Sequence, residues 1–583
     1  MVLCGIIVLE DILEDIYHAY FLKKTNYTRG LYLQIYDSFF DKTAKRNRHK
    51  CFKKLGYVED LINSGISDPV EHFQKEVIKL NKERKAKEEQ DKIKLISSRS
   101  PVRNFGYFLT KILVNALGLR DAMEPMKYLN NFSFPISSLI EALIYSRIVQ
   151  PCSKLKTYNE VLPLLYEDYD FSLDQIYDGL DFIGKRYSQF VEIMNHCISN
   201  SFKRNTSVSY FDCTNYYFEI DLENQDKQKG PSKENRPNPI IGQALLLDGN
   251  SIPMGMKMYP GNESEKPKIR EIINDLKRTN NISGKTIQVA DKGLNCGDNI
   301  YNAIQNGDGY IFSQSVLKLD EVEKQWVISD NDYSSVKDSD GNVLYKIKSF
   351  VDKYPIRITN KAGKKETIYV QQKRVATFNP ALKEKKTIEI MKLVDKASNL
   401  CHCQIKKSEF GDAAKYVNFI DDDGNIAKAV INSEKVQNDL KYAGYNLIVS
   451  SEINMSKQEI YRVYHKLWKI EDTFRILKSQ LDARPVYLQS KDRIYGHFLI
   501  CYYAVTLLRL LEEKVFKNTL SVYEIKDIIR NLNLIKQDNG NINISTDSNN
   551  INKICEMHGL NIKHYYLQDK DLVKLFKMKY RLK

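Results

Sequence analysis

Hydrophobic and polar positions divide the chain into segments with different periodicities. Residues 18–60 hold short runs of aromatic, β-branched and polar residues, such as "GLYLQIYDSFF", which we interpret as strands separated by turns. Residues 71–94 form a strongly charged helix, which we interpret as a solvated connector. Between residues 105 and 203 the apolar positions recur every three to four residues, so this segment is predicted to be all-helical.

From residue 207 onward, strand-like and helix-like patterns alternate. The run "SVSYFDCTNYYFEI" and two apolar runs joined at "DGN" predict three strands, the last two as a hairpin. A helix, a buried strand, a second helix and a further strand follow. The order β-β-β-α-β-α-β predicts a mixed sheet that is antiparallel at first and then parallel through crossover connections.

A later stretch, "YHKLWKIEDTFRILKS", reads as one amphipathic helix with a functional edge. Tyr464, Glu471 and Lys478 are seven residues apart, and seven residues advance two helical turns less about 20°, so the three side chains follow one edge. Beside that edge runs an apolar stripe that must face a core: Val463, Leu467, Ile470, Phe474, Leu477 and Leu481.

These patterns predict a multidomain α+β protein. Its predicted segments are a small β unit with the charged helix (18–100), a helical domain expected to bind DNA (101–204), the first part of a mixed α/β core (205–318), a β-rich basic insertion (319–446), the second part of the core with the glutamate helix (447–515) and a C-terminal helical tail (516–583).

Length and charge narrow the class of protein. A chain of 583 residues is too long for one core, and 42% hydrophobic residues exclude wholesale disorder. The net charge of +14 fits a polyanion binder without proving one. Residues 346–392 contain 13 Lys+Arg and 4 Asp+Glu, an excess of nine, which is what a phosphate-facing surface requires.

Cysteine usage and apolar runs indicate the compartment. The ten cysteines are scattered without a CxxC pair, as in reducing surroundings, and the N-terminus lacks the basic region of a signal peptide. The longest apolar run, 498–511, is too short to span a bilayer and contains Arg509, so we interpret it as a buried core helix. We expect a cytoplasmic protein.

Three carboxylates stand where chemistry is plausible. Asp212 lies inside an apolar strand and Asp291 ends another, and such carboxylates are costly unless paired, hydrogen-bonded or bound to a metal. Taken singly, each aspartate could equally cap the next turn, and Glu471 could be a solvated helix acid. Together, on a β-β-β-α-β-α-β scaffold, they suit two Mg²⁺ ions, because hard cations take carboxylate oxygens.

The glutamate helix resembles that of the DDE transposases of bacterial insertion sequences, in the IS-four superfamily. Its "YREK" signature is Tyr, two residues, Arg, three residues, Glu, six residues, Lys. Tyr464, Glu471 and Lys478 match it at the correct spacing, whereas Leu467 stands at the arginine position. Arg475, one turn after the glutamate, is a candidate to replace the missing phosphate contact.

Further stretches resemble the IS-sixteen-thirty-four branch of that superfamily, from about residue 18 to 510. Among them are "GLYLQIYDSFFD", "YFDCTNYYFE", "SKENRP", "MYPGNESE" and "VADKGLN". The resemblance implies an RNase H-like catalytic core in which Asp212, Asp291 and Glu471 bind two Mg²⁺ ions, with Mn²⁺ able to substitute. It also implies a β-rich insertion between the last core strand and the glutamate helix.

The resemblance further implies a set of DNA contacts. Tyr464, Lys478 and Arg475 would contact the DNA backbone near the cut, and the basic insertion would contact the transposon end. The candidates in that insertion are Lys364, Lys365, Lys373, Arg374 and Trp326, the last by stacking on an unpaired base. For Trp326 the alternative is ordinary packing in the core of the insertion.

The expected function is therefore cut-and-paste transposition in a prokaryotic cytoplasm, with the protein associated with the nucleoid. The partners would be double-stranded DNA, as terminal inverted repeats and target, and a second copy of the chain in a synaptic homodimer. Two alternatives stay open: a transposase-derived DNA-binding protein without catalysis, for which Leu467 is the reason, and an RNase H-like nuclease that does not transfer strands.

Overall fold

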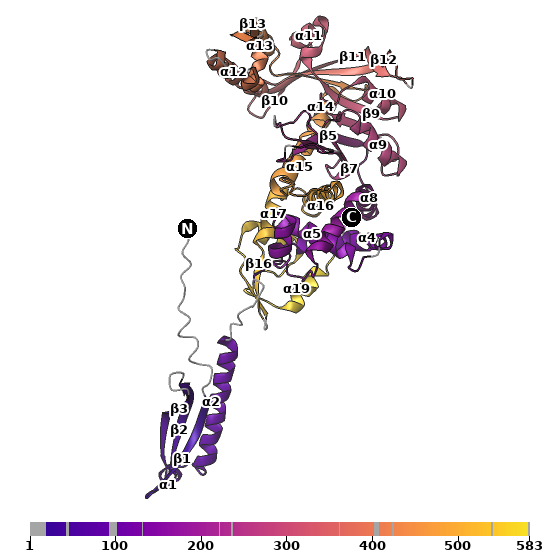
Figure 1. Cartoon of the computed structure of the whole chain (residues 1–583). Coiled ribbons are helices and arrows are strands. Elements are labelled where there is room, and N and C mark those ends of the chain that lie inside the picture. Colours follow the sequence, from indigo (N-terminus) through magenta and orange to yellow (C-terminus); the bar gives the residue numbers. More distant parts are fainter. Residues whose placement is uncertain are drawn as a thin grey trace. The chain divides into compact units, whose positions relative to one another are not determined.

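A computed structural model describes residues 19–41, 46–91, 102–130, 132–220, 222–224, 226–234, 237–360, 362–401, 407–422, 425–537 and 540–580. The chain divides into two compact units, Met1–Ser98 and Arg99–Lys583 (Figure 1). The protein is thus a multidomain α+β chain, and its second unit contains one large mixed sheet.

The first unit is a three-stranded antiparallel sheet with a helix along one face (Figure 1). Its elements are β1 (Ala19–Tyr27), β2 (Gly30–Asp41), β3 (Arg46–Tyr57), α1 (Val58–Asn63) and α2 (Pro69–Asp91). The backbone amide and carbonyl of Tyr20 both bond the side chain of Asn81 at 2.8 Å, and Leu33 and Ile35 are completely buried. The connector interpretation of the charged helix is therefore wrong: α2 packs on the sheet through Phe73, Val77 and Asn81, spaced four residues apart.

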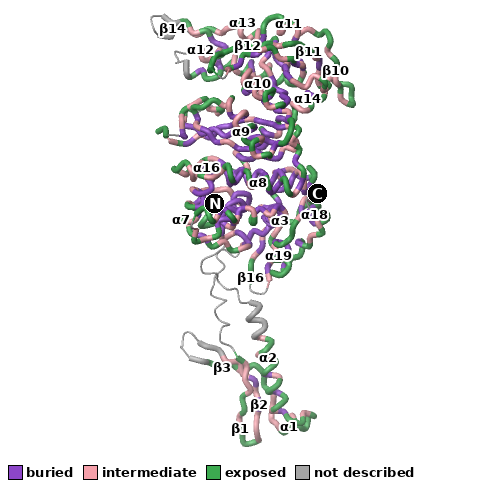
Figure 2. The backbone as a smooth tube through the Cα atoms, turned by 90° about the vertical axis from the view of Figure 1, so that its right-hand side faces the viewer, coloured by how far each residue is buried: buried purple, intermediate pink, exposed green. Residues whose placement is uncertain are grey.

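The second unit begins with helices that surround a buried central helix. The leading helices are α3 (Phe108–Leu117), α4 (Leu119–Met123), α5 (Ile136–Val149), α7 (Leu173–Lys185) and α8 (Tyr187–Ser201). They pack around α16 (Lys491–Leu510), whose residues from Ile494 to Leu510 are all buried (Figure 2). By length and composition α16 could cross a membrane, but its apolar stretch is entirely inside the fold, which confirms the core-helix interpretation.

The C-terminal segment is not a purely helical tail. Its helices α17 (Val522–Asn531), α18 (Asn549–His558) and α19 (Asp569–Phe576) alternate with three short strands, β16 (Asn533–Gln537), β17 (Gly540–Asn543) and β18 (Tyr566–Leu567). These strands join β4 (Val102–Asn104), far back in the chain, in a sheet ordered β18-β17-β16-β4. Strands of two to five residues are too short to show a clear period-two pattern, so the sequence pattern does not identify them as strands.

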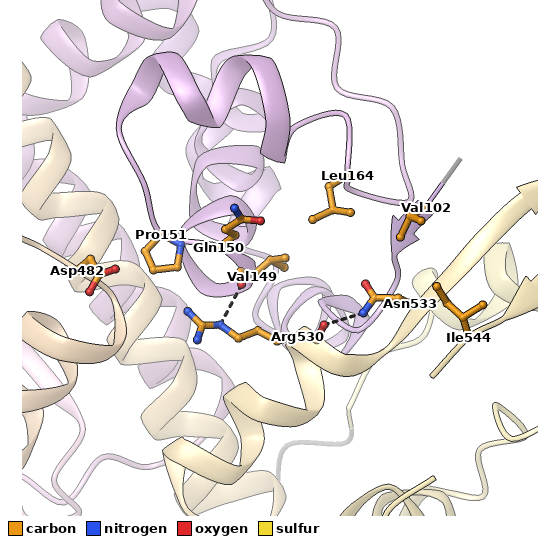
Figure 3. Close-up of a pocket in the computed structure, with 9 residues that line it drawn as sticks. All are labelled: Val102, Val149, Gln150, Pro151, Leu164, Asp482, Arg530, Asn533 and Ile544. Atoms are coloured by element: carbon orange, nitrogen blue, oxygen red, sulfur yellow. Dashed lines mark hydrogen bonds between the residues drawn. The ribbon is translucent and has the colours of Figure 1, made fainter. Parts of the chain in front are cut away.

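A pocket of about 490 Å³ lies where this segment meets the leading helices (Figure 3). In it the Arg530 Nε donates to the Val149 carbonyl at 3.0 Å, and the Asn533 side chain donates to the Arg530 carbonyl at 2.8 Å. Asp482 is the one carboxylate in its lining. The pocket therefore lies in the packing between two segments, and Asp212, Asp291 and Glu471 do not line it.

The large sheet contains the predicted element order. β5 (Val208–Tyr217), β6 (Ile240–Asp248), β7 (Pro253–Pro260), α9 (Lys268–Arg278), β8 (Ile287–Ala290), α10 (Gly297–Gln305) and β9 (Gly309–Gln314) follow one another as β-β-β-α-β-α-β. In space the strands lie in the order β7-β6-β5-β8-β9. The first three strands pair antiparallel, and β5, β8 and β9 pair parallel, so this prediction is confirmed.

The region 319–446 extends the same sheet and does not form a separate β-rich module. β15 (Tyr445–Ser450) pairs with β9, which would otherwise be the edge of the core strands, and β12 (Lys365–Phe378), β11 (Val343–Thr359) and β10 (Ser334–Lys337) continue outward from β15. The unpaired backbone groups of an edge strand favour such additions. The region also contains α11 (Glu321–Ile328), α12 (Pro380–Cys401), α13 (Ser433–Lys441) and the hairpin of β13 (Val417–Asp422) and β14 (Asn425–Ile431).

The segment predicted as one helix is broken twice. α14 (Lys457–His465) and α15 (Trp468–Arg475) are separated by a turn, and α15 continues into a π-helical turn, η5 (Ile476–Gln480). Five of the six stripe residues are nevertheless buried (Leu467, Ile470, Phe474, Leu477 and Leu481), Val463 is half-buried, and Trp468 is 51% exposed.

The packing of α15 predicts different costs for two aromatic residues on the same helix. Phe474→Ala should lower the free energy of unfolding by about 3–5 kcal/mol, because it leaves a cavity in the core. Trp468→Ala, the control on the exposed face, should change it by less than about 0.5 kcal/mol. Denaturant unfolding of both variants measures this, and equal losses would mean that the helix is rotated.

Candidate functional site

Two aspartates lie next to each other on adjacent parallel strands, Asp212 inside β5 and Asp291 directly after the end of β8. β5 and β8 pair through Phe211 and Ala290, and the next residue along the chain from each is the aspartate, Asp212 or Asp291. Neighbouring strands are about 4.8 Å apart, so the two carboxylates start from adjacent backbone positions. The register between β8 and β9 places Ser313 next to Asp291, and its hydroxyl donates to Asp291 Oδ1 at 3.0 Å.

The alternation of side chains along β5 aims Asp212 at the glutamate helix. Tyr210 and Tyr216 belong to the same core cluster as Ile470 and Phe474 of α15, whereas Phe211 and Cys213 pack in a second cluster with α9. Asp212, two residues from Tyr210, therefore faces α15. The backbone N–H of Cys213 donates to Asp212 Oδ1 at 2.7 Å and fixes the carboxylate.

Glu471, in the first turn of α15, interacts electrostatically with Asp291, as Asp212 does. Burial among protein atoms raises the pKa of Asp212 to about 6, and the charge of Asp291 adds to the shift. The pKa of Glu471 is also raised, first by burial and then by the charge of Asp291. Asp291 thus links the other two carboxylates, because its negative charge opposes the ionisation of both Asp212 and Glu471.

Lys233 supplies a positive charge within this group. Its ammonium lies 3.7 Å from Asp212 Oδ1 and 3.5 Å from Glu265 Oε1, and it donates to the Cys213 carbonyl. Its charge also opposes the rise in the pKa of Glu471. Lys233 and Glu265 lie in "SKENRP" and "MYPGNESE", but spacing alone does not distinguish them from neighbouring charged residues.

A second charge cluster surrounds Glu234. Lys478 donates to Glu234 Oε1 at 3.3 Å, and Arg484 pairs with the other oxygen of the same carboxylate. The Lys478 ammonium also lies 5.4 Å from the centre of the Tyr216 ring, and burial lowers its pKa. Lys478, which is predicted to contact the DNA backbone, therefore pairs with a carboxylate of the protein in this conformation.

Tyr464 and Arg475 also have partners inside the chain. The Tyr464 hydroxyl donates to Asp291 Oδ1 at 3.4 Å, and burial raises its pKa. Tyr464 therefore orients the aspartate. Arg475 is exposed and pairs with Asp472 at 2.5 Å. Leu467, at the arginine position of the signature, is 6% exposed and packs in the core, as predicted for this residue.

A buried arginine anchors the glutamate helix. Arg509 of α16 is 2% exposed and contacts Asp472 Oδ2 at 2.7 Å, Glu512 Oε2 at 2.7 Å and Thr473 Oγ1 at 3.0 Å. Asp472 and Thr473 directly follow Glu471. From sequence Arg509 was only a break in an apolar run, and its partners lie 36 and 37 positions earlier in the chain.

The predicted DNA contacts of the basic insertion need correction. Lys364 and Lys365 are exposed at the tip of the β11–β12 hairpin, as a phosphate contact requires. The Lys373 ammonium instead donates to the carbonyls of Met455, at 2.7 Å, and Ile453, at 3.2 Å. Arg374 is 1% exposed and pairs with Glu323, because its position on β12 faces inward.

Trp326 is a packing residue in this conformation. Its ring meets Phe350 edge to face at 4.5 Å between centres, and the Lys348 ammonium lies 4.9 Å from the ring centre. It adjoins the second core cluster. The stacking prediction for Trp326 therefore gives way to the packing alternative.

The oxygen atoms of the three carboxylates suit a hard cation, although the carboxylates do not surround a single point in this conformation. Among the described residues no group of three or more His, Cys, Asp or Glu side chains is arranged tightly enough to hold a metal ion. Asp212, Asp291 and Glu471 offer only oxygen ligands, and the Lys233 ammonium already lies against this acidic group. The site thus already accommodates one positive charge, that of the Lys233 ammonium.

A family model matches part of the chain. Residues 218–507 match the family model described as the transposase DDE domain, a region that contains Asp291 and Glu471 and begins six residues after Asp212. The match supports a DDE transposase. No curated protein matches the chain.

One solved structure found by similarity is described as "Cryo-EM structure of piggyBac transposase synaptic complex with hairpin DNA". It is 8% identical, and the match covers 73% of this chain and 78% of that chain with a TM-score of 0.36. That score is too low for the likeness to define the fold.

The anchoring of α15 predicts unequal effects for two arginines that contact the same aspartate. Arg509→Met should lower the free energy of unfolding by about 3–5 kcal/mol, because it removes the buried guanidinium that Asp472 and Glu512 share and leaves Asp472 only the exposed Arg475. Arg475→Met, the exposed control on Asp472, should cost less than about 1 kcal/mol. Thermal and denaturant unfolding measure both, and similar losses would remove Arg509 from its anchoring role.

Proposed function

We propose that this chain, which matches the transposase DDE domain over residues 218–507, is a transposase that cuts DNA at the ends of an insertion sequence and joins those ends to target DNA. The observation that carries the proposal is the convergence of Asp212, Asp291 and Glu471. Two come from adjacent parallel strands, Asp212 from inside β5 and Asp291 from directly after β8, and the third comes from α15, which packs against β5.

The proposed core is RNase H-like and the proposed family branch is the IS-four superfamily. The element order β-β-β-α-β-α-β followed by the glutamate helix supports the first assignment. Three of the four signature positions support the second. The fourth, Leu467, is buried in the core, so this chain uses that position to dock α15.

In this proposal Asp212, Asp291 and Glu471 hold two Mg²⁺ ions, for which Mn²⁺ can substitute. Such ions, when bound, stabilise the attacking and leaving oxygens of a phosphoryl displacement. Water attacks the phosphorus at the element's end and releases a 3′-hydroxyl, and that hydroxyl then attacks a target phosphorus and displaces a 3′-oxygen there.

The chain's own residues position this chemistry. Ser313 and Tyr464 donate to one oxygen of Asp291, and the Cys213 N–H holds Asp212. Lys478 and Arg484 are held together by Glu234 beside the site, where they would contact the DNA backbone. Lys364 and Lys365 would contact phosphates from the hairpin tip. Two copies of the chain would pair two ends in the prokaryotic cytoplasm.

Two other functions share parts of this site. A nuclease without strand transfer would use the same carboxylates and differ only in its products. A DNA-binding protein without catalysis would have no need for three coupled carboxylates, which is why we place it last.

The three carboxylates test the proposed function. Asp212→Asn, Asp291→Asn and Glu471→Gln should each reduce strand cleavage by more than about a hundredfold while leaving binding to end-containing duplexes within about twofold, because they remove oxygen ligands only. Gel assays of cleavage and of joined products measure this. Cleavage without joined products would favour the nuclease, and wild-type cleavage by any variant would exclude that residue.

The position of the Lys233 ammonium beside Asp212 leads to a second prediction, which is measured without an activity assay. Lys233→Met should strengthen Mn²⁺ binding to the DNA-free protein by about tenfold, because it removes a positive charge next to Asp212. Lys257→Met, which alters an ion pair with Glu271, serves as the control and should leave binding unchanged. Titration calorimetry measures both, and weaker Mn²⁺ binding in Lys233→Met would show that the ammonium supports the site and does not compete for it.

A further inference from the structure

The three-stranded sheet of the first unit has one face that α2 does not cover, which we call the open face. Leu33 and Ile35 of β2 lie buried on the helix side, and Asp37 on that side pairs with Arg84 of α2. Because side chains alternate along a strand, Tyr32 and Tyr36 lie on the open face. Their cross-strand partners share that face, which thus includes Tyr57.

The open face is basic. Register places Lys23 of β1 opposite Gln34, and Lys54 of β3 opposite the same residue, so both lysines lie on this face and both are exposed. The three strands contain seven Lys+Arg and two Asp, a net charge of +5. Among the strand positions on the open face that the structure describes, none is an aspartate or glutamate.

The aromatic rings of the open face are packed against one another and against cations. Tyr32 meets Tyr57 edge to face at 4.8 Å, and Tyr27 meets Tyr32 at 6.0 Å. The Lys23 ammonium lies over the Tyr36 ring at 4.6 Å, and the Arg29 guanidinium lies over the Tyr57 ring at 4.8 Å. Ring faces occupied in this way are poor platforms for stacked bases, whereas ammonium and phenol groups suit phosphate oxygens.

We propose that the open face binds duplex DNA. The backbones of the outer strands are two strand spacings apart, about 10 Å, close to the ~12 Å width of the major groove. β-Sheets bind DNA grooves in other proteins by the same complementarity. This inference deepens the proposed function and rests on it, because a transposase must hold DNA beyond the residues at the cut.

The helical segment 101–204 is a less suitable DNA-binding site than the open face. The helical segment 101–204 was expected to bind DNA, but α5 within it is buried at all but one of its positions and packs around α16. DNA binding by the first unit would leave those helices to support the catalytic core. Lys23 and Lys54 then become the side chains to test.

The test compares two double substitutions in the full-length protein that remove equal charge from opposite faces of the same unit. Lys23→Gln with Lys54→Gln alters the open face. Lys75→Gln with Lys79→Gln alters two lysines of α2 with side chains 74% and 76% exposed. Binding to a 30-base-pair duplex of arbitrary sequence is followed by fluorescence anisotropy from about 50 to 200 mM salt.

The open-face substitutions should reduce the slope of log affinity against log salt by about 1.8, or 0.9 for each lost phosphate contact. Affinity at about 100 mM salt should fall at least tenfold. The α2 control should keep the wild-type slope. Lys23→Arg with Lys54→Arg should also keep it, which separates loss of charge from misfolding.

Three outcomes would overturn the inference: an unchanged slope in the open-face variant, an equal loss in the α2 control, or an effect confined to a single-stranded oligonucleotide. The proposed function fails differently, through cleavage that does not depend on Asp212. The slope comparison can be made on Asp212→Asn protein, so the two failures are distinguishable.

Discussion

The buried guanidinium of Arg509 is the interaction on which the candidate site most depends. It joins α16, the fully enclosed helix of the second unit, to Asp472 and Thr473 of α15. A buried cation is costly unless its partners are close and complete, and here two carboxylates and a hydroxyl surround it. The arrangement ties Glu471, one residue before Asp472, to the same core that supports the strands of Asp212 and Asp291.

Cations of the chain itself offset part of the negative charge at the site. Lys233 lies against Asp212 and Glu265, while Glu234 holds Lys478 and Arg484. Lys233 carries the positive charge that a metal ion would bring to the carboxylates. Glu234 carries the negative charge that a DNA phosphate would bring to Lys478 and Arg484. Binding would therefore exchange internal ion pairs for external ones, and the internal pairs lower the repulsion among the like charges of the unbound site.

The predictions that held rest on local periodicity. The alternation in "SVSYFDCT" predicts a strand, the apolar end of "TIQVAD" predicts Asp291 at a strand end, and the stripe that contains Leu467 and Phe474 predicts the buried face of α15. Each of these depends on side chains within a few residues of one another, which is the distance over which strand and helix geometry repeats. The element order of the core follows from the same information.

Tertiary structure alone decided which distant segments meet. β15 pairs with β9 and connects the strands of the region 319–446 to the core sheet, Arg374 turns inward to Glu323, and β4 pairs with β16 over 400 residues later. The ion pairs of Lys233 and Arg509 are likewise long-range contacts. A charged residue has the same local pattern whether it is solvated or paired across the fold, so only the packed chain assigns its partner. The sequence by itself determined the elements of the core and made the three carboxylates candidates; the fold determined which cations pair with the site and anchor its helix, because those contacts join residues far apart in the chain.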